Sequence, residues 1–180
     1  MNSIEYATFF EESAKGENYP EELNHYVPLN LHRQQRWMKH GVISDSLQEQ
    51  ISKITSTQHW VLITEPWCGD AAHTVPFIIK MAELNSKINL EIQLRDINSE
   101  IDQYLTNGGK SVPMLIVRDE EKKDLFVWGP RPKELQAIYL DLKAKNKNFE
   151  EIKTILQKWY NEDKGERIQD EILELLQGLN

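Results

Sequence analysis

The residue of this chain best suited to covalent chemistry is its one cysteine, Cys68, in the stretch Thr-Glu-Pro-Trp-Cys-Gly-Asp-Ala at 64–71. The apolar run at 60–63 predicts a buried strand before this stretch, and a helical pattern begins near Ala71. A cysteine on a strand-to-helix turn lies near free backbone N–H groups and the positive end of a helix dipole, which both favour the thiolate. The stretch is therefore a candidate site of sulfur chemistry.

The cysteine count limits which chemistry this site can perform. Exchange between a dithiol and a disulfide needs a second thiol to release the mixed disulfide, and the chain has none. A lone cysteine also excludes an internal disulfide and a multi-cysteine metal cluster, and it fits a reducing compartment, so we expect a cytoplasmic protein. The histidines have no metal-ligand spacing, and we expect neither a metal nor another cofactor. His73 lies about 140° from Cys68 around an ideal helix, which argues against a Cys–His pair.

Composition excludes several other classes of partner. The chain has 180 residues and a net charge of −8, which argues against nucleic acid, since neutralising phosphates requires clustered Lys and Arg. No apolar stretch approaches the ~18 residues that a bilayer span needs, and the start shows no secretory signal, so no membrane partner is expected. The densest basic segment, 143–147, is interpreted as the exposed face and end of a helix.

The elements that must position Cys68 follow from the hydrophobic periods. Runs at 59–63, 90–94, 114–117 and 125–128 predict four strands. A helical crossover makes the first two strands parallel, and a short link makes the last two an antiparallel hairpin. Helices are predicted on both sides of these strands, including one from Pro28 to Met38 with Asn30 as its N-cap.

This order of elements, with a Trp-Cys-Gly turn after the first strand, resembles the thioredoxin fold. Residues 67–69 are similar to the first half of the family's Trp-Cys-Gly-Pro-Cys motif. Pro76 stands where thioredoxins have the proline that kinks the active-site helix, and Pro113 stands where they have a cis-proline. Gly129 ends the fourth strand, as a glycine does in that family. The resemblance identifies the chain as a thioredoxin-like family protein.

The resemblance implies an α/β, thioredoxin-like fold: a central four-stranded mixed sheet flanked by helices, with additional N- and C-terminal helices. We expect a single domain over 1–180, made of an N-terminal helical extension (1–56), a core (57–143) and a C-terminal helical extension (144–180). The strings at 107–113 and 128–132 resemble a bacterial subgroup with Trp-Cys-Gly-Asp-Ala in place of Cys-x-x-Cys. The added helices offer a partner surface or a homodimer interface.

Three departures from the family pattern bear on activity. The resolving cysteine, three residues after the nucleophile, is replaced by Ala71, and the proline between the two cysteines by Asp70. The buried aspartate six residues before the nucleophile is Leu62 here. Ordinary dithiol activity is therefore excluded by composition.

The candidate site gathers around the cysteine. Cys68 is the candidate catalytic residue, although a small buried thiol is the alternative. Asp70 has two readings: a carboxylate that raises the pKa of the thiol, or a cap of the following helix. Trp67 is interpreted as a partly exposed wall beside the sulfur. The substrate- or peptide-binding set is Trp67, Gly69, Asp70, Val112 and Pro113.

The backbone of Val112, next to Pro113, is expected from the resemblance to pair with an extended peptide or a glutathione-like ligand. Arg95 follows the second strand at the edge where open α/β sheets bind ligands. It is a candidate for supporting the thiolate or holding a carboxylate, with a surface ion pair as the alternative. Arg131, between two prolines, is a further candidate.

Two functions fit these residues. The first is monothiol redox chemistry, in which Cys68 attacks a disulfide, a sulfenic acid or a glutathionylated thiol and an external thiol resolves the product. Its partner would be a protein or a low-molecular-weight thiol or disulfide. The alternative is a non-catalytic thioredoxin-fold module that binds a peptide or protein and has lost dithiol activity. Whether the chain is an enzyme stays open at this level.

Overall fold

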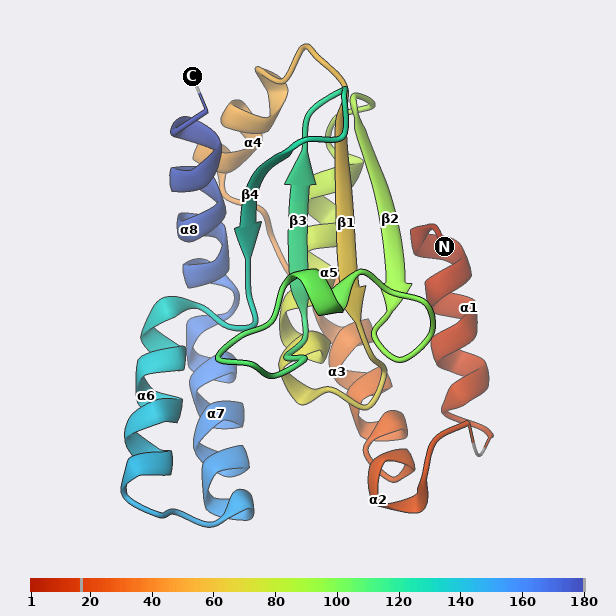
Figure 1. Ribbon diagram of the computed structural model, residues 1–180, viewed down its shortest axis with the longest axis vertical. Coiled ribbons are helices and arrows are strands. Elements are labelled where there is room, and N and C mark those ends of the chain that lie inside the picture. Colours follow the sequence, from red (N-terminus) through yellow and green to blue (C-terminus); the bar gives the residue numbers. More distant parts are fainter. Residues whose placement is uncertain (17, 180) are drawn as a thin grey trace.

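A four-stranded mixed sheet forms the centre of the computed structural model, which describes residues 1–16 and 18–179. The strand order is β2-β1-β3-β4 (Figure 1). β1 pairs parallel with β2, and β3 pairs antiparallel with both β1 and β4. The sheet and its flanking helices confirm the predicted fold class. The strands are β1 (Gln58–Thr64), β2 (Ile88–Leu94), β3 (Met114–Arg118) and β4 (Asp124–Trp128).

Helices precede and follow the sheet in the chain, as expected. α5 (Gly69–Glu83) connects β1 to β2 and starts directly after Cys68. The N-terminal helices are α1 (Ser3–Ser13), α2 (Glu21–Asn24), α3 (Val27–His40) and α4 (Asp45–Ser52). A 3₁₀ turn, η1 (Ile101–Gln103), lies between β2 and β3, and the C-terminal helices are α6 (Lys133–Ala144), α7 (Phe149–Asp163) and α8 (Glu166–Gln177).

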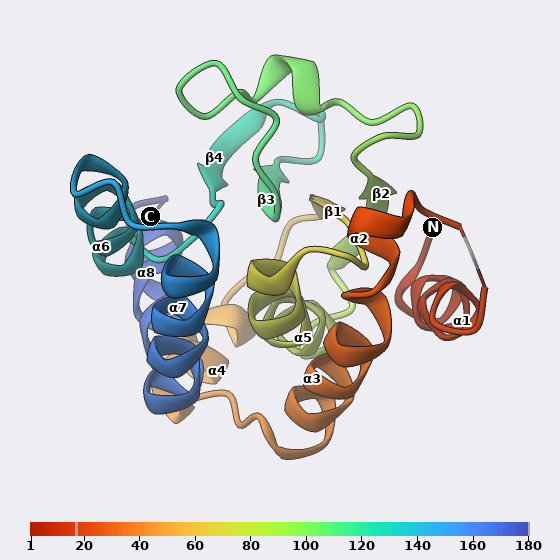
Figure 2. The ribbon, with the colours of Figure 1, turned by 90° about the horizontal axis from the view of Figure 1, so that it is seen from below.

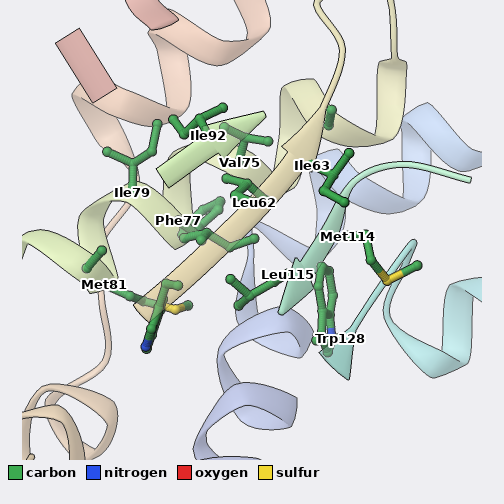
Figure 3. Close-up of a cluster of buried hydrophobic side chains, with 14 of the residues drawn as sticks. Leu62, Ile63, Val75, Phe77, Ile79, Met81, Ile92, Met114, Leu115 and Trp128 are labelled. Carbon is green, nitrogen blue, oxygen red and sulfur yellow. The ribbon is translucent and has the colours of Figure 1, made fainter. Parts of the chain in front are cut away.

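The main core lies between α5 and the sheet. Trp60 to Thr64 of β1 are all buried, because β1 is an inner strand with both faces covered. Side chains from β1, α5, β2, β3 and β4 meet in this core (Figure 3). Pro76 interrupts neither α5 nor the packing, since α5 continues on both sides of it and the residue is buried.

A second apolar cluster joins α6 to α7. It comprises Leu135, Leu142, Ile152, Leu156 and Tyr160. This helical hairpin therefore has its own small core. When the molecule is seen from below, α7 and α3 lie on opposite sides of α5 (Figure 2). The contacts that bind the hairpin to the start of α5 are consequently important for the site.

The predicted role of Asn30 was wrong. α3 begins at Val27, so Asn30 lies inside the helix, where it is buried. Its side-chain amide donates to the Pro66 carbonyl at 3.1 Å. Asn30 therefore pins α3 to the turn before Cys68, a tertiary contact that local spacing does not reveal.

Within residues 1–16 and 18–179, no helix combines the length and the apolar character that a membrane span requires.

Two glycines with similar backbone angles provide a stability test. Gly165 has φ +82° and Gly108 has φ +78°, both in the left-handed region. A Cβ on Gly165 would overlap the ring of Phe77, which is fully buried, whereas a Cβ on Gly108 meets nothing within 4 Å. Gly108→Ala should cost about 1 kcal/mol from backbone strain. Gly165→Ala should cost a further ~1–3 kcal/mol from overpacking. Urea denaturation measures both variants, and equal losses would contradict this packing.

Candidate functional site

Cys68 is buried at the N-terminal end of α5. It is the N-cap residue of that helix, and its backbone N–H donates to the Glu65 carbonyl at 3.0 Å, which closes the turn. The Sγ–H group donates to the Val112 carbonyl at 3.2 Å. The thiol thus has a hydrogen-bond acceptor that a thiolate could not use.

The pKa of the Cys68 thiol is raised to about 12, first by burial and second by the Asp70 carboxylate. The backbone N–H groups of Ala71 and Asp70 and the guanidinium of Arg131 act in the opposite direction. The backbone N–H groups at the start of the helix favour the thiolate, as expected, but desolvation and the Asp70 carboxylate outweigh them.

Asp70 links the turn to the C-terminal extension. Its Oδ2 atom lies 2.7 Å from Nη2 of Arg131, and its Oδ1 atom accepts a hydrogen bond from the Tyr160 hydroxyl at 2.9 Å. The side chains of Asp70 and Arg131 are only 12% and 15% exposed, so this ion pair is mostly desolvated. Within residues 1–16 and 18–179, no side chain caps α5. Of the two readings of Asp70, the electrostatic one holds and the capping one is wrong.

Arg131 is held on three sides. Besides its ion pair with Asp70, its Nη1 atom donates to Gln136 at 3.0 Å, and its guanidinium lies 4.3 Å from the centre of the Tyr139 ring. Its Nε atom is buried and has no partner within the described part of the chain. The structure thus brings Arg131 and Asp70 together, although 61 positions separate them in the sequence.

Trp67 and Arg95 form a second pair. The Arg95 guanidinium lies 4.5 Å from the centre of the Trp67 ring and forms an ion pair with Asp96 at 2.8 Å. Trp67 is partly exposed, and its Nε1 atom is buried without a partner among the described residues. Arg95 therefore supports the Trp67 ring, and its charge is already matched by Asp96.

Val112 and Pro113 lie behind the turn. The peptide bond between them is cis, and both residues are buried. The carbonyl of Val112 already accepts the Cys68 thiol. One of the two acceptor positions of this carbonyl is therefore used by the thiol, and pairing of the Val112 backbone with an extended peptide or a glutathione-like ligand stays a prediction.

A pocket of about 230 Å³ opens beside the turn. Trp67, Gly69, Asp70 and Arg131 line it, so half of the predicted site residues share this surface, while Cys68, Val112, Pro113 and Arg95 lie outside it. α3 forms one wall, and the α6–α7 hairpin forms the other. Lys143 and Lys147, from the basic segment noted in the sequence, are exposed and stand at this pocket.

His73 connects three helices around the pocket, α3, α5 and α7. Its Nδ1 atom accepts from Nε1–H of Trp37 at 2.9 Å, which leaves the ring proton on Nε2, 3.0 Å from the Gln157 side-chain oxygen. The ring also stacks on Tyr160, with centroids 4.6 Å apart. Burial lowers the pKa of His73 to about 4, so the ring is neutral. His73 therefore positions α3 and α7 against α5, and the expectation of no Cys–His pair is confirmed.

Glu65 ties the turn to the N-terminal extension. This buried carboxylate accepts from the Tyr19 hydroxyl at 3.0 Å and from the backbone N–H of Asp96 at 3.1 Å. Burial raises its pKa above the usual range. Glu65 thus joins the ends of β1 and β2 to the segment before α2.

Sequence reasoning missed Asn30, Arg33, Gln157 and Tyr160. Tyr160 lies 90 positions from its partner Asp70, and Gln157 lies 84 positions from His73. No local spacing connects such residues. The charged residues of α3 carried no signal either, since Arg33 belongs to an ordinary polar helix pattern.

Comparisons with known proteins bear on the fold. A family model described as Thioredoxin matches residues 16–163. No curated protein matches the chain. A protein of unknown function from Pseudomonas aeruginosa is similar in structure, with a TM-score of 0.60 and 16% identity over 100% of this chain and 99% of that one. An HIV epitope-scaffold has a TM-score of 0.59 and 17% identity, with 99% of each chain covered. At these identities the likeness to the two structures shows the fold alone.

The stability of the protein should decrease as the pH is lowered, because of His73. Its folded pKa of about 4 lies below the ordinary 6.5, so protons bind the unfolded state first. The stabilisation is complete above pH 6.5 and is lost as the pH falls toward 4, by up to about 3 kcal/mol. His73→Gln cannot titrate. We therefore expect the variant to be less stable than the wild-type protein by the largest amount at pH 7, and this difference to decrease toward pH 4 in urea denaturation. A constant deficit would contradict the lowered pKa.

Replacing Asp70 should change both the thiol and the fold. Asp70→Asn removes the charge that raises the pKa of Cys68, so the reaction with an aromatic disulfide at alkaline pH should accelerate. The same change leaves Arg131 without a counter-charge and should cost about 3 kcal/mol.

Asp96→Asn is the matched control, because it removes an exposed ion-paired carboxylate that does not act on the thiol. It should cost no more than about 1 kcal/mol and leave the reaction rate unchanged. Equal reactivity of the two variants would exclude Asp70 as the cause.

Proposed function

Because the chain belongs to the thioredoxin family, we propose that it is a binding protein built on that scaffold, in which the one cysteine has a structural role. The observation that carries this proposal is the state of Cys68: buried, protonated and donating to the Val112 carbonyl. A nucleophilic cysteine needs the opposite conditions, namely an accessible sulfur with a thiolate population near ambient pH. The chain also contains no second cysteine to release a mixed disulfide.

The pocket beside Gly69 is the binding surface in this proposal. It contains four of the residues that sequence analysis selected, and both added helical regions contribute walls to it. A concave site with aromatic walls and a few polar groups is the usual form of a ligand site.

Monothiol exchange is the second candidate function. It is favoured by the N–H groups of Ala71 and Asp70 and by the Arg131 guanidinium, which all lower the pKa of the thiol. In this case an opening of the turn would have to expose Cys68, and an external thiol would have to resolve the adduct. The binding function is preferred because burial and Asp70 outweigh those groups.

Thiol labelling tests the proposal. A pKa near 12 reduces the thiolate fraction at neutral pH ~3,000-fold relative to an ordinary thiol, and the greater nucleophilicity of a basic thiolate recovers part of this. The folded protein should therefore form a mixed disulfide with oxidised glutathione roughly 100-fold more slowly than the unfolded chain does. Intact mass measures the adduct over time.

Two controls accompany this measurement. Cys68→Ser should give no adduct and should retain the fold, because a hydroxyl can also donate to the Val112 carbonyl. The unfolded chain in denaturant should react at the rate of an ordinary thiol. An adduct that forms equally fast on the folded protein would overturn the structural role of Cys68 and favour monothiol exchange.

A further inference from the structure

The pocket beside Gly69 is basic, although the chain as a whole is acidic. Among the residues that the structure describes, five positively charged side chains and one carboxylate line it, on a chain with a net charge of −8. A concave surface lined by one sign of charge concentrates ions of the opposite sign. The positive lining residues are Arg33, Arg131, Lys143, Lys147 and Lys153.

Some of these charges are already matched. Asp70, the only carboxylate among the described residues of the lining, pairs with Arg131. Lys147 and Lys153 have helix-neighbour partners in Glu151 and Glu150, at 2.8 and 2.7 Å. The Lys147–Glu151 pair is well exposed, so solvent screens it and leaves the Lys147 ammonium able to turn toward a ligand. Lys153 is held by more than its ion pair, because its ammonium also lies 4.8 Å from the centre of the Tyr26 ring.

Arg33 and Lys143 have no carboxylate within 4 Å in the parts of the chain that the structure describes. Arg33 is partly buried, and burial together with Arg36 lowers its pKa. Placing a guanidinium there without a counter-charge is unfavourable. An anion in the pocket would supply the missing counter-charge.

The position of Arg33 is set by a short hydrogen-bond chain. Its Nη1 atom donates to the Asn30 side-chain oxygen at 2.9 Å, and the Asn30 amide donates to the Pro66 carbonyl. The same Nη1 atom lies 3.9 Å from the point where a Cβ on Gly69 would be. The guanidinium is thus directed at the first residue of α5, and its charge adds to the positive end of that helix dipole.

Apolar groups make up much of the remaining lining. Tyr26, Tyr139 and Phe149 supply aromatic rings, and Ile152 and Leu156 supply aliphatic surface. The volume of about 230 Å³ is below the ~300–1,000 Å³ of pockets that enclose drug-sized molecules. The occupant must therefore be small, with an apolar body as well as a charged group.

We propose that this pocket binds a small organic anion, with one carboxylate or phosphate group on a flat apolar body. The acidic group would lie between Arg33 and the start of α5, where a planar guanidinium matches its oxygen atoms. The body would lie against the aromatic side chains. This inference rests on the binding function proposed above and adds the chemical class of the ligand.

Titrations with phenylacetate and phenyl phosphate test the inference, with amide chemical shifts and calorimetry as readouts. We expect both aryl anions to shift the resonances of Gly69 and its neighbours, and the affinity to fall as salt is added. The stronger of the two identifies the preferred acidic group. Benzyl alcohol supplies the body without the charge, and inorganic phosphate supplies the charge without the body; both should bind at least tenfold more weakly.

Three variants locate the charge that matters. Arg33→Gln should weaken binding of the aryl anions about tenfold or more, and Arg33→Lys should retain most of it. Arg36→Gln is the matched control, since Arg36 lies on the same helix outside the pocket and bonds to Asn161 instead. It should change the affinity less than threefold.

Other outcomes would overturn the inference. Equal binding of benzyl alcohol would mean an apolar cavity only, and equal binding of inorganic phosphate would mean an adventitious ion only. If the amide resonances of the turn did not shift, or if Arg33→Gln and Arg36→Gln lost the same amount of affinity, Arg33 would not belong to the binding site. None of these results depends on thiol labelling, so failure of the ligand class and failure of the structural role of Cys68 are distinguishable.

Discussion

The contact between the Asp70 carboxylate, the Arg131 guanidinium and the Tyr160 hydroxyl holds the candidate site together. It joins the turn after β1 to two residues of the C-terminal region, and it does so where the charges are mostly desolvated. Removing one member of such a pair leaves a buried charge without compensation, so the contact persists only as a unit. The α6–α7 hairpin has an apolar cluster of its own. Its orientation toward α5 near the turn therefore depends on polar contacts, of which this one and the His73 contacts are central.

The same carboxylate acts together with burial to keep the sulfur protonated. A dithiol site needs a thiolate and a second thiol, but here a negative charge and burial keep Cys68 protonated, and Ala71 occupies the second position. The carboxylate also neutralises Arg131, so that the positive charge left at the pocket belongs to Arg33 and the lysines. In our proposal the protonated thiol and the neutralised Arg131 have the same explanation: the turn forms the floor of a binding pocket and not a redox site.

The two helical extensions contribute to the pocket in different ways. The N-terminal extension brings Arg33 to Gly69 through Asn30 and the Pro66 carbonyl. The α6–α7 hairpin, whose second helix belongs to the C-terminal extension, supplies most of the aromatic and aliphatic wall and the rim lysines. His73 fixes the spacing between the two because its ring nitrogens face Trp37 on α3 and Gln157 on α7. Its lowered pKa makes this arrangement sensitive to acid.

Local pattern in the sequence was sufficient to predict the sheet, its parallel and antiparallel pairings, the helix after Cys68 and the thioredoxin-like fold. These features depend on periodicity and on turn residues close to one another in the chain, where physical preferences act over a few positions. The absence of a second thiol also followed from composition alone. Tertiary structure decided the rest: Asp70 meets Tyr160 from 90 positions away, Asn30 caps nothing and instead holds the turn, and Arg33 lies beside Gly69. The charge of Asp70, two positions after Cys68, was visible in the sequence, but the larger effect on the pKa of the thiol is desolvation, which depends on tertiary packing and is not encoded in local spacing.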